Sequence, residues 1–137
     1  MLKKNILIYG ATGSIGSSVL NLIRNNRELF NVVGLTCNSN IDKLIEIAKE
    51  FECNNLGINN ENIMPNYLKL KDYTVHAGLD EFYKLMNSNV DIIIFAIAGS
   101  SPLKLLLDLS TSGKIIGMAN KECIICLGKT LLNIASE

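Results

Sequence analysis

Three glycines spaced three residues apart follow the first apolar run of this chain. Residues 6–9 read Ile-Leu-Ile-Tyr, and Gly10, Gly13 and Gly16 come directly after them. An apolar stripe at helical spacing starts in the same segment and comprises Ile15, Val19, Leu22 and Ile23. A strand that ends in such a glycine turn and continues as a helix is typical of a dinucleotide-binding unit. We therefore interpret residues 5–26 as a nucleotide site rather than as a corner without a ligand.

Each glycine is expected to serve a different purpose. Gly10 lets the chain reverse at the end of the strand, Gly13 lets the backbone approach a pyrophosphate, and Gly16 lets the helix pack close to the strand. The free N–H groups and partial positive charge of the helix N-terminus would then face the phosphates.

Length and composition exclude several classes of protein. With 137 residues, 48% of them hydrophobic, the chain is large enough for one folded domain and is not a disordered segment. Its 13 basic and 13 acidic residues give no net charge and form no basic patch, so we expect no nucleic-acid partner. The longest apolar run, 92–98, is too short for a membrane span, and the N-terminus enters a strand at once. These features predict a cytoplasmic protein that does not associate with membranes.

Strands and helices are expected to alternate along the chain. The expected strands are Asn5–Tyr9, Val32–Cys37, Asn55–Ile58, Tyr73–Ala77, Asp91–Ile97 and Lys114–Met118. The expected helices are Ser14–Asn26, Ile41–Phe51, Leu79–Asn87, Leu103–Thr111 and a last one that ends near Ile134. This order predicts an α/β fold of the Rossmann-like, doubly wound type, with a mostly parallel sheet and helices on both faces. The strand Asp91–Ile97 is apolar throughout and is expected to be buried on both faces.

The cysteines and the histidine do not suggest a catalytic site. Cys123 and Cys126 form a C-x-x-C pair, but Cys37 and Cys53 are too far apart to supply the second pair of a zinc site. We expect all four thiols to be reduced and to pack as small apolar groups. His76 lies in an expected strand without a cluster of partners, so no catalytic role is assigned to it.

The end of the second expected strand bears on the choice of nucleotide. Folds that bind NAD place an Asp or Glu there to hold the ribose diol, whereas this chain has Asn38, Ser39 and Asn40. These side chains can donate to phosphate oxygens, which favours NADP over NAD. Lys43 is the nearest cation, and Asp42 is interpreted as a carboxylate in the first turn of a helix.

Three segments together resemble a known family. Gly-Ala-Thr-Gly-Ser-Ile-Gly at 10–16, Ala-Ile-Ala-Gly at 96–99 and Ala-Asn-Lys-Glu at 119–122 are similar to the NADPH-binding domain of 1-deoxy-D-xylulose 5-phosphate reductoisomerases. The resemblance covers the whole chain. It implies an enzyme of the methylerythritol phosphate route to isoprenoids, which rearranges its substrate and reduces it with NADPH to 2-C-methyl-D-erythritol 4-phosphate.

The resemblance also implies roles for single residues. Gly10, Thr12, Gly13, Ser14 and Ile15 would contact or shape the site of the NADPH pyrophosphate. Asn40 would lie beside the adenosine ribose and its 2′-phosphate, Asn120 and Glu122 beside the nicotinamide, and Lys121 would reach the substrate. Asn38 and Ser39 are counted with the cofactor site because their side chains can donate to phosphate oxygens. Relatives commonly have Gly and a basic residue where this chain has Asn38 and Ser39, so the strength of the NADP preference stays open. No catalytic residue and no metal ligand is assigned within the chain.

Length is the larger departure from the family. Members are much longer, and their metal-binding Asp-Ser-Glu segment would begin after Glu137. We therefore expect residues 1–137 to be the NADPH-binding domain, without the catalytic and C-terminal domains and inactive alone. Mg²⁺ or Mn²⁺, a phosphorylated sugar substrate and a homodimer are expected only for the intact enzyme.

Two other interpretations stay open at this point. The chain could be a stand-alone NADP-binding sensor, or the cofactor domain of another NADP-dependent reductase such as a semialdehyde dehydrogenase. The latter enzymes need a cysteine nucleophile and a histidine base. Cys123 or Cys126 could be the nucleophile, but His76 is a poor candidate for the base.

Overall fold

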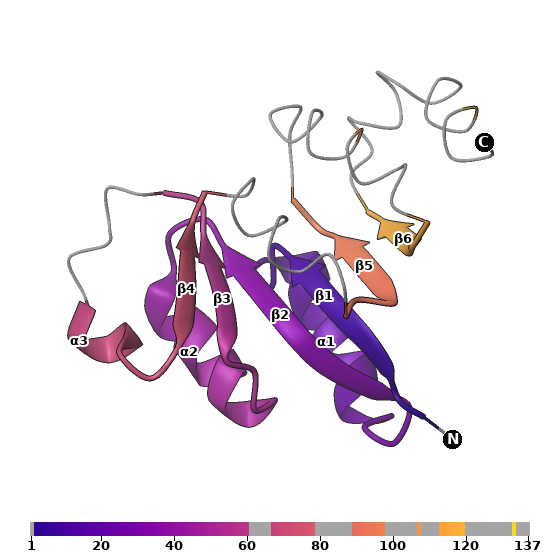
Figure 1. Cartoon of the computed structure of the whole chain (residues 1–137), viewed down its shortest axis with the longest axis horizontal. Coiled ribbons are helices and arrows are strands. Elements are labelled where there is room, and N and C mark those ends of the chain that lie inside the picture. Colours follow the sequence, from indigo (N-terminus) through magenta and orange to yellow (C-terminus); the bar gives the residue numbers. More distant parts are fainter. Residues whose placement is uncertain are drawn as a thin grey trace.

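Six parallel strands form one sheet in the computed structural model, which describes residues 2–60, 67–78, 89–97, 107, 113–119 and 133 (Figure 1). The strands are β1 (Lys4–Tyr9), β2 (Phe30–Cys37), β3 (Asn55–Ile58), β4 (Thr74–Ala77), β5 (Ile92–Phe95) and β6 (Ile115–Met118). The helices are α1 (Ser14–Arg24), α2 (Ile41–Glu50) and the short α3 (Tyr67–Leu70). The predicted Rossmann-like α/β class is confirmed, and every pairing of the described strands is parallel.

The strand order places a switch point between β1 and β5. The order across the sheet is β4-β3-β2-β1-β5-β6, so the chain steps outward from β1 to β4 and then returns to the other side of β1. Tyr9 at the end of β1 pairs with Phe95 at the end of β5. The strand that follows β1 in the chain lies on one side of this pair and the strand that follows β5 lies on the other. In open α/β sheets, ligands bind at the carboxyl ends of the strands at such a switch point.

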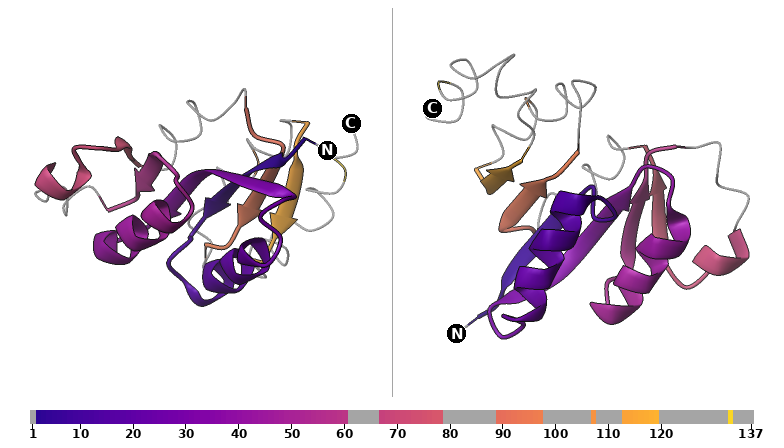
Figure 2. Two further views of the ribbon diagram at one scale, coloured as in Figure 1. Left: turned by 90° about the horizontal axis from the view of Figure 1, so that it is seen from below. Right: turned by 180° about the vertical axis from the view of Figure 1, so that it is seen from behind.

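Both long helices cover the same face of the sheet, and Figure 2 shows α1 and α2 side by side against it. Leu20 and Ile23 of α1 and Leu44 and Ala48 of α2 are buried in one cluster with side chains of β1, β2 and β3. Burial of each Leu or Ile side chain in this cluster contributes about 1.5–3 kcal/mol. The helices expected at 79–87 and 103–111, and the last helix, fall almost entirely outside the described residues.

The predicted stripe of α1 is partly wrong. Ile23 is buried and Val19 packs against the core, but Ile15 is 42% exposed and Leu22 is 66% exposed. The buried face of α1 contains Gly16, Leu20 and Ile23 instead. Gly16 packs directly against the backbone of Gly10 and Ala11, so the face of α1 that carries Gly16 points inward, while Ile15 and Leu22 point outward.

The prediction for β5 also needs correction. The strand is Ile92–Phe95 rather than Asp91–Ile97, and only alternate residues are buried. Ile92 and Ile94 are half-buried and pack against the core cluster rather than within it. Asp91 precedes the strand, where its carboxylate accepts a hydrogen bond from the Asn5 N–H at 2.8 Å.

A charged clamp joins the C-terminal ends of α1 and α2. The Glu50 carboxylate accepts hydrogen bonds from Arg24 and Arg27, and the Arg27 guanidinium lies 4.7 Å from the centre of the Phe51 ring. The Arg24 hydrogen bond holds the pKa of Glu50 below its ordinary value. These groups are partly exposed, so their ion pairs contribute little to stability.

Gly16→Ala is predicted to destabilise the fold. A Cβ at position 16 would collide with the Gly10 carbonyl oxygen and would lie 2.8 Å from Ala11 Cα, and these are backbone atoms that cannot rotate away. We expect a loss of about 3 kcal/mol in the free energy of unfolding, measured by urea denaturation. Ser18→Ala, at an exposed position of the same helix, is the control and should change stability little. Equal stability of the Gly16→Ala and Ser18→Ala variants would contradict the packing described.

The buried thiols predict a loss of stability at alkaline pH. Burial raises the pKa of both Cys37 and Cys53 from 9.0 to about 11. Below pH 9 both states keep the thiol protons, whereas between pH 9 and 11 only the unfolded chain releases them, so stability falls as pH rises. Each thiol contributes a slope of up to about 1.4 kcal/mol per pH unit. Urea denaturation across this range should therefore give a shallower decline for a Cys37→Ala, Cys53→Ala double variant, and parallel curves would contradict the prediction.

Candidate functional site

The glycine loop, residues 10–16, lies at the carboxyl end of β1 beside the end of β5. Gly10 has φ +84°, a left-handed conformation that favours glycine. A Cβ on Gly10 would lie 2.6 Å from the Ala96 carbonyl oxygen, directly after β5. Gly10 therefore lets the two strand ends approach each other at the switch point.

Gly13 differs from the other two glycines of this loop. Its φ of −81° and ψ of 177° are extended values that any residue adopts. A Cβ on Gly13 would meet only the Gly10 carbonyl oxygen, at an ordinary contact distance of 3.7 Å. Neither the backbone conformation nor the internal packing of the described residues thus requires glycine here. A side chain at position 13 would extend into exposed space at the N-terminus of α1.

The N-terminus of α1 faces that same space. Gly13 is its N-cap, no side chain of the described residues caps the helix, and the first turn contains no acidic residue. The N–H groups of a first helical turn have no partner within the helix and carry partial positive charge. Ser14 and Ile15 follow Gly13 and are exposed, so their N–H groups are available to an anion.

Two residues that lie far from the loop in the sequence hold it in place. The Thr36 hydroxyl of β2 accepts a hydrogen bond from the Gly10 N–H at 2.9 Å, and the Thr36 carbonyl accepts one from the Ala11 N–H at 2.8 Å. Thr36 is only 1% exposed. From α2, the Lys43 ammonium donates to the Thr12 carbonyl at 2.9 Å. The loop is therefore a preorganised part of the fold.

Sequence reasoning gave these two residues no structural role. Thr36 is a polar residue near the carboxyl end of a mostly apolar strand, and this position is the one feature of the sequence that could have indicated its role. Lys43 was noted only as the nearest cation.

The predicted adenosine-side residues lie at the same edge of the sheet, in the loop from β2 to α2. Asn38, Ser39 and Asn40 are all exposed. The Asn40 side chain caps α2 by accepting from the Lys43 N–H at 3.2 Å. The Asp42 carboxylate turns to Lys69, 2.7 Å away, in keeping with its interpretation as a first-turn carboxylate. The side chains that this loop exposes are therefore amides and a hydroxyl, and residues 37–41 include no Asp or Glu.

The remaining predicted site residues are outside the described part of the chain. Asn120, Lys121 and Glu122 follow Ala119, whose N–H donates to the Phe95 carbonyl at 3.1 Å. That hydrogen bond places the carboxyl end of β6 beside the carboxyl end of β5. The backbone that leads into residues 120–122 thus starts at the same edge of the sheet as the glycine loop.

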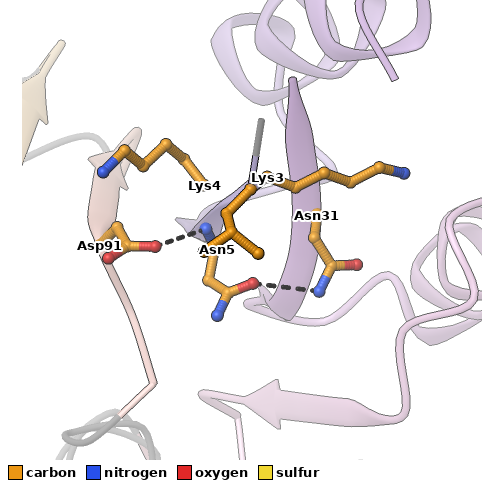
Figure 3. Close-up of a pocket in the computed structure, with 6 residues that line it drawn as sticks. Lys3, Lys4, Asn5, Asn31 and Asp91 are labelled. Atoms are coloured by element: carbon orange, nitrogen blue, oxygen red, sulfur yellow. Dashed lines mark hydrogen bonds between the residues drawn. The ribbon is translucent and has the colours of Figure 1, made fainter. Parts of the chain in front are cut away.

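An open hollow of about 520 Å³ lies at the opposite edge, among the amino ends of β1, β2 and β5 (Figure 3). Leu2, Lys3 and Lys4 line part of it. Its other polar side chains bond within the hollow: Asn31 donates to the Asn5 side chain at 3.1 Å, and the Asp91 carboxylate accepts from the backbone N–H of Asn5 (Figure 3). These contacts join the strands, and we assign the hollow no ligand.

The described residues contain neither a cluster of metal ligands nor a membrane-spanning helix. No three His, Cys, Asp or Glu side chains within this part of the chain converge as metal ligands. No helix there has the length and hydropathy needed to cross a bilayer.

Thr36→Val is predicted to destabilise the chain by about 1–3 kcal/mol, because the isosteric side chain leaves the Gly10 N–H without its acceptor. Urea denaturation measures the loss. Thr36→Ser, which keeps the hydroxyl, is the matched control and should retain more of the stability. A valine variant as stable as the serine variant would show that the hydroxyl does not anchor the loop.

Comparisons of the sequence with known proteins identify one family. The family model described as 1-deoxy-D-xylulose 5-phosphate reductoisomerase matches residues 6–128. The reductoisomerase of Phocaeicola vulgatus is 33% identical over 143 residues, which cover 99% of this chain and 37% of that protein. This chain thus spans about a third of the length of the curated relatives it matches.

Solved structures of reductoisomerases are also similar to this chain. The reductoisomerase from Zymomonas mobilis in complex with NADPH superposes with a TM-score of 0.86 at 29% identity, over 98% of this chain and 36% of that one. A reductoisomerase in complex with NADPH, fosmidomycin and magnesium has a TM-score of 0.83 at 30% identity, over 97% of this chain and 34% of that one.

Proposed function

Because this chain belongs to the 1-deoxy-D-xylulose 5-phosphate reductoisomerase family, we propose that it binds NADPH at the carboxyl edge of its sheet. It would be the cofactor-binding part of an enzyme that isomerises and reduces 1-deoxy-D-xylulose 5-phosphate to 2-C-methyl-D-erythritol 4-phosphate. The likeness to a reductoisomerase solved with NADPH supports this proposal. The family match favours it over the cofactor domain of a semialdehyde dehydrogenase.

The observation that carries the proposal is the glycine at position 13. The fold tolerates a Cβ there, so the glycine serves a partner that approaches from outside. A pyrophosphate fits this place, because its charge is complementary to the N-terminus of α1 and its oxygens accept hydrogen bonds from backbone N–H groups. Thr12, Gly13, Ser14 and Ile15 would hold it.

The adenosine and nicotinamide ends would extend to either side of the pyrophosphate. Asn38, Ser39 and Asn40 would surround the adenosine ribose, and the absence of a carboxylate from residues 37–41 favours a 2′-phosphate over a free diol. On the resemblance, Asn120 and Glu122 would contact the nicotinamide, and Lys121 would reach the substrate.

The bound cofactor supplies the hydride, and this chain supplies binding and orientation. A divalent ion, Mg²⁺ or Mn²⁺, and the phosphorylated sugar would be held by the longer enzyme, as would the contacts of a homodimer. The likeness to a reductoisomerase solved with magnesium and fosmidomycin supports the metal requirement. We place the enzyme in the cytoplasm and expect the 137 residues alone to bind NADPH without turnover.

Gly13→Ala is the sharpest test of cofactor binding. The variant should keep the wild-type unfolding midpoint, because its Cβ has room, but should bind NADPH at least about tenfold more weakly, a loss of about 1.4 kcal/mol. Titration of NADPH fluorescence measures the affinity, with Ser18→Ala as the control. Undiminished affinity of a folded Gly13→Ala variant would contradict the proposed site.

The catalytic part of the proposal has a separate test. The chain alone, mixed with NADPH, Mg²⁺ and 1-deoxy-D-xylulose 5-phosphate, should bind NADPH and leave its absorbance unchanged. Substrate-dependent oxidation of NADPH would show that the 137 residues are catalytic by themselves.

A further inference from the structure

Lys43 occupies an unusual place for a cation. It is the third residue of α2, its side chain is half-buried, and it reaches from α2 to the glycine loop. Its ammonium lies 2.9 Å from the Thr12 carbonyl and 3.5 Å from the Ser17 hydroxyl. Both partners are neutral, so these contacts position the positive charge without neutralising it.

Other cations of the described residues lie elsewhere or pair with carboxylates. Arg24 and Arg27 bind Glu50 at the C-terminal ends of α1 and α2. Lys69, which lies near the start of α2, pairs with Asp42, the carboxylate that precedes Lys43 in the sequence. Within the described part of the chain, Lys43 is the cation between the glycine loop and the loop of residues 38–40.

That location corresponds to one group of the proposed cofactor. The pyrophosphate is expected at the N-terminus of α1, whereas the adenosine ribose is expected beyond the end of β2. Lys43 lies in the first turn of the helix that follows β2, and Asn40, which caps that helix, lies in the loop where the ribose is expected. A 2′-phosphate on the ribose would therefore lie nearer to Lys43 than to the first turn of α1.

We propose that Lys43 pairs with the 2′-phosphate of NADPH and makes this chain select NADPH over NADH, an inference that rests on the proposed function. The ammonium has three donors and can bond a phosphate oxygen while it keeps its contact with the loop. Hydrogen bonds between two charged groups are among the stronger ones in proteins. Lys43 would thus supply the positive charge that Asn38 and Ser39 do not provide.

The test compares nucleotides that differ only in the 2′-phosphate. Titrations of the chain with NADPH and NADH, and with adenosine 2′,5′-bisphosphate and adenosine 5′-phosphate, give four dissociation constants for each variant. Lys43→Gln should weaken binding of the two 2′-phosphorylated ligands by about ten- to a hundredfold and leave the other two unchanged. Lys43→Arg keeps the charge and should keep the preference. Lys49→Gln, on the same helix but distant from both loops, is the matched control.

Other outcomes separate this proposal from the proposed function. A Lys43→Gln variant that loses affinity equally for all four ligands would overturn the proposal, because Lys43 would then act on the loop or the pyrophosphate. A wild-type chain that binds NADPH and NADH equally would overturn it too, and would leave the nucleotide site itself intact. A folded wild-type chain that binds none of the four would overturn the proposed function.

A second test uses the wild-type chain alone and needs no substitution. If an ammonium holds the 2′-phosphate, the preference for NADPH over NADH should shrink steadily as the salt concentration rises. A preference independent of salt would contradict an ion pair.

Discussion

The close approach of α1 to the end of β1 is the contact on which the geometry of the site depends. Gly16 lies against the Gly10 carbonyl and Ala11, with no room for a Cβ. This contact sets the distance between helix and strand and also the rotation of the helix, since the face that carries Gly16 must point inward. The N-terminus of α1 is thereby directed at the switch point between β1 and β5. An anion bound there would meet backbone N–H groups that the fold has already oriented.

The strand β2 contributes to the site in two ways. Inside the sheet, the Thr36 hydroxyl and carbonyl hold Gly10 and Ala11, which removes freedom from the glycine loop before any ligand binds. Beyond its end, β2 continues into the polar loop of residues 38–40 and then into α2. The Lys43 side chain of α2 contacts the glycine loop by donating to the Thr12 carbonyl. The glycine loop and the loop of residues 38–40 are thus linked through Lys43, whose backbone N–H donates to Asn40 and whose ammonium donates to Thr12.

Sequence reasoning was most successful where local patterns determine local structure. Asn55–Ile58 was predicted with the bounds that the structure has, and the other described strands and long helices were placed to within a few residues. It was less successful for side-chain exposure. Leu22 was placed on the buried stripe and is exposed, because the direction of that stripe depends on where Gly16 contacts the strand. Similarly, Ile92 and Ile94 are only half-buried, which depends on how far α1 and α2 extend across the sheet.

The sequence alone determined the class of fold, the glycine loop and the absence of a carboxylate from residues 37–41, because each of these depends on residues that are adjacent along the chain. The tertiary structure decided which glycines the fold needs and which one it does not, since that distinction rests on the atoms around each Cβ. It also decided the roles of Thr36 and Lys43, which are separated from their partners by 26 and 31 residues. Such contacts exist only after parallel strands have aligned their carboxyl ends, and no local pattern of residues encodes them.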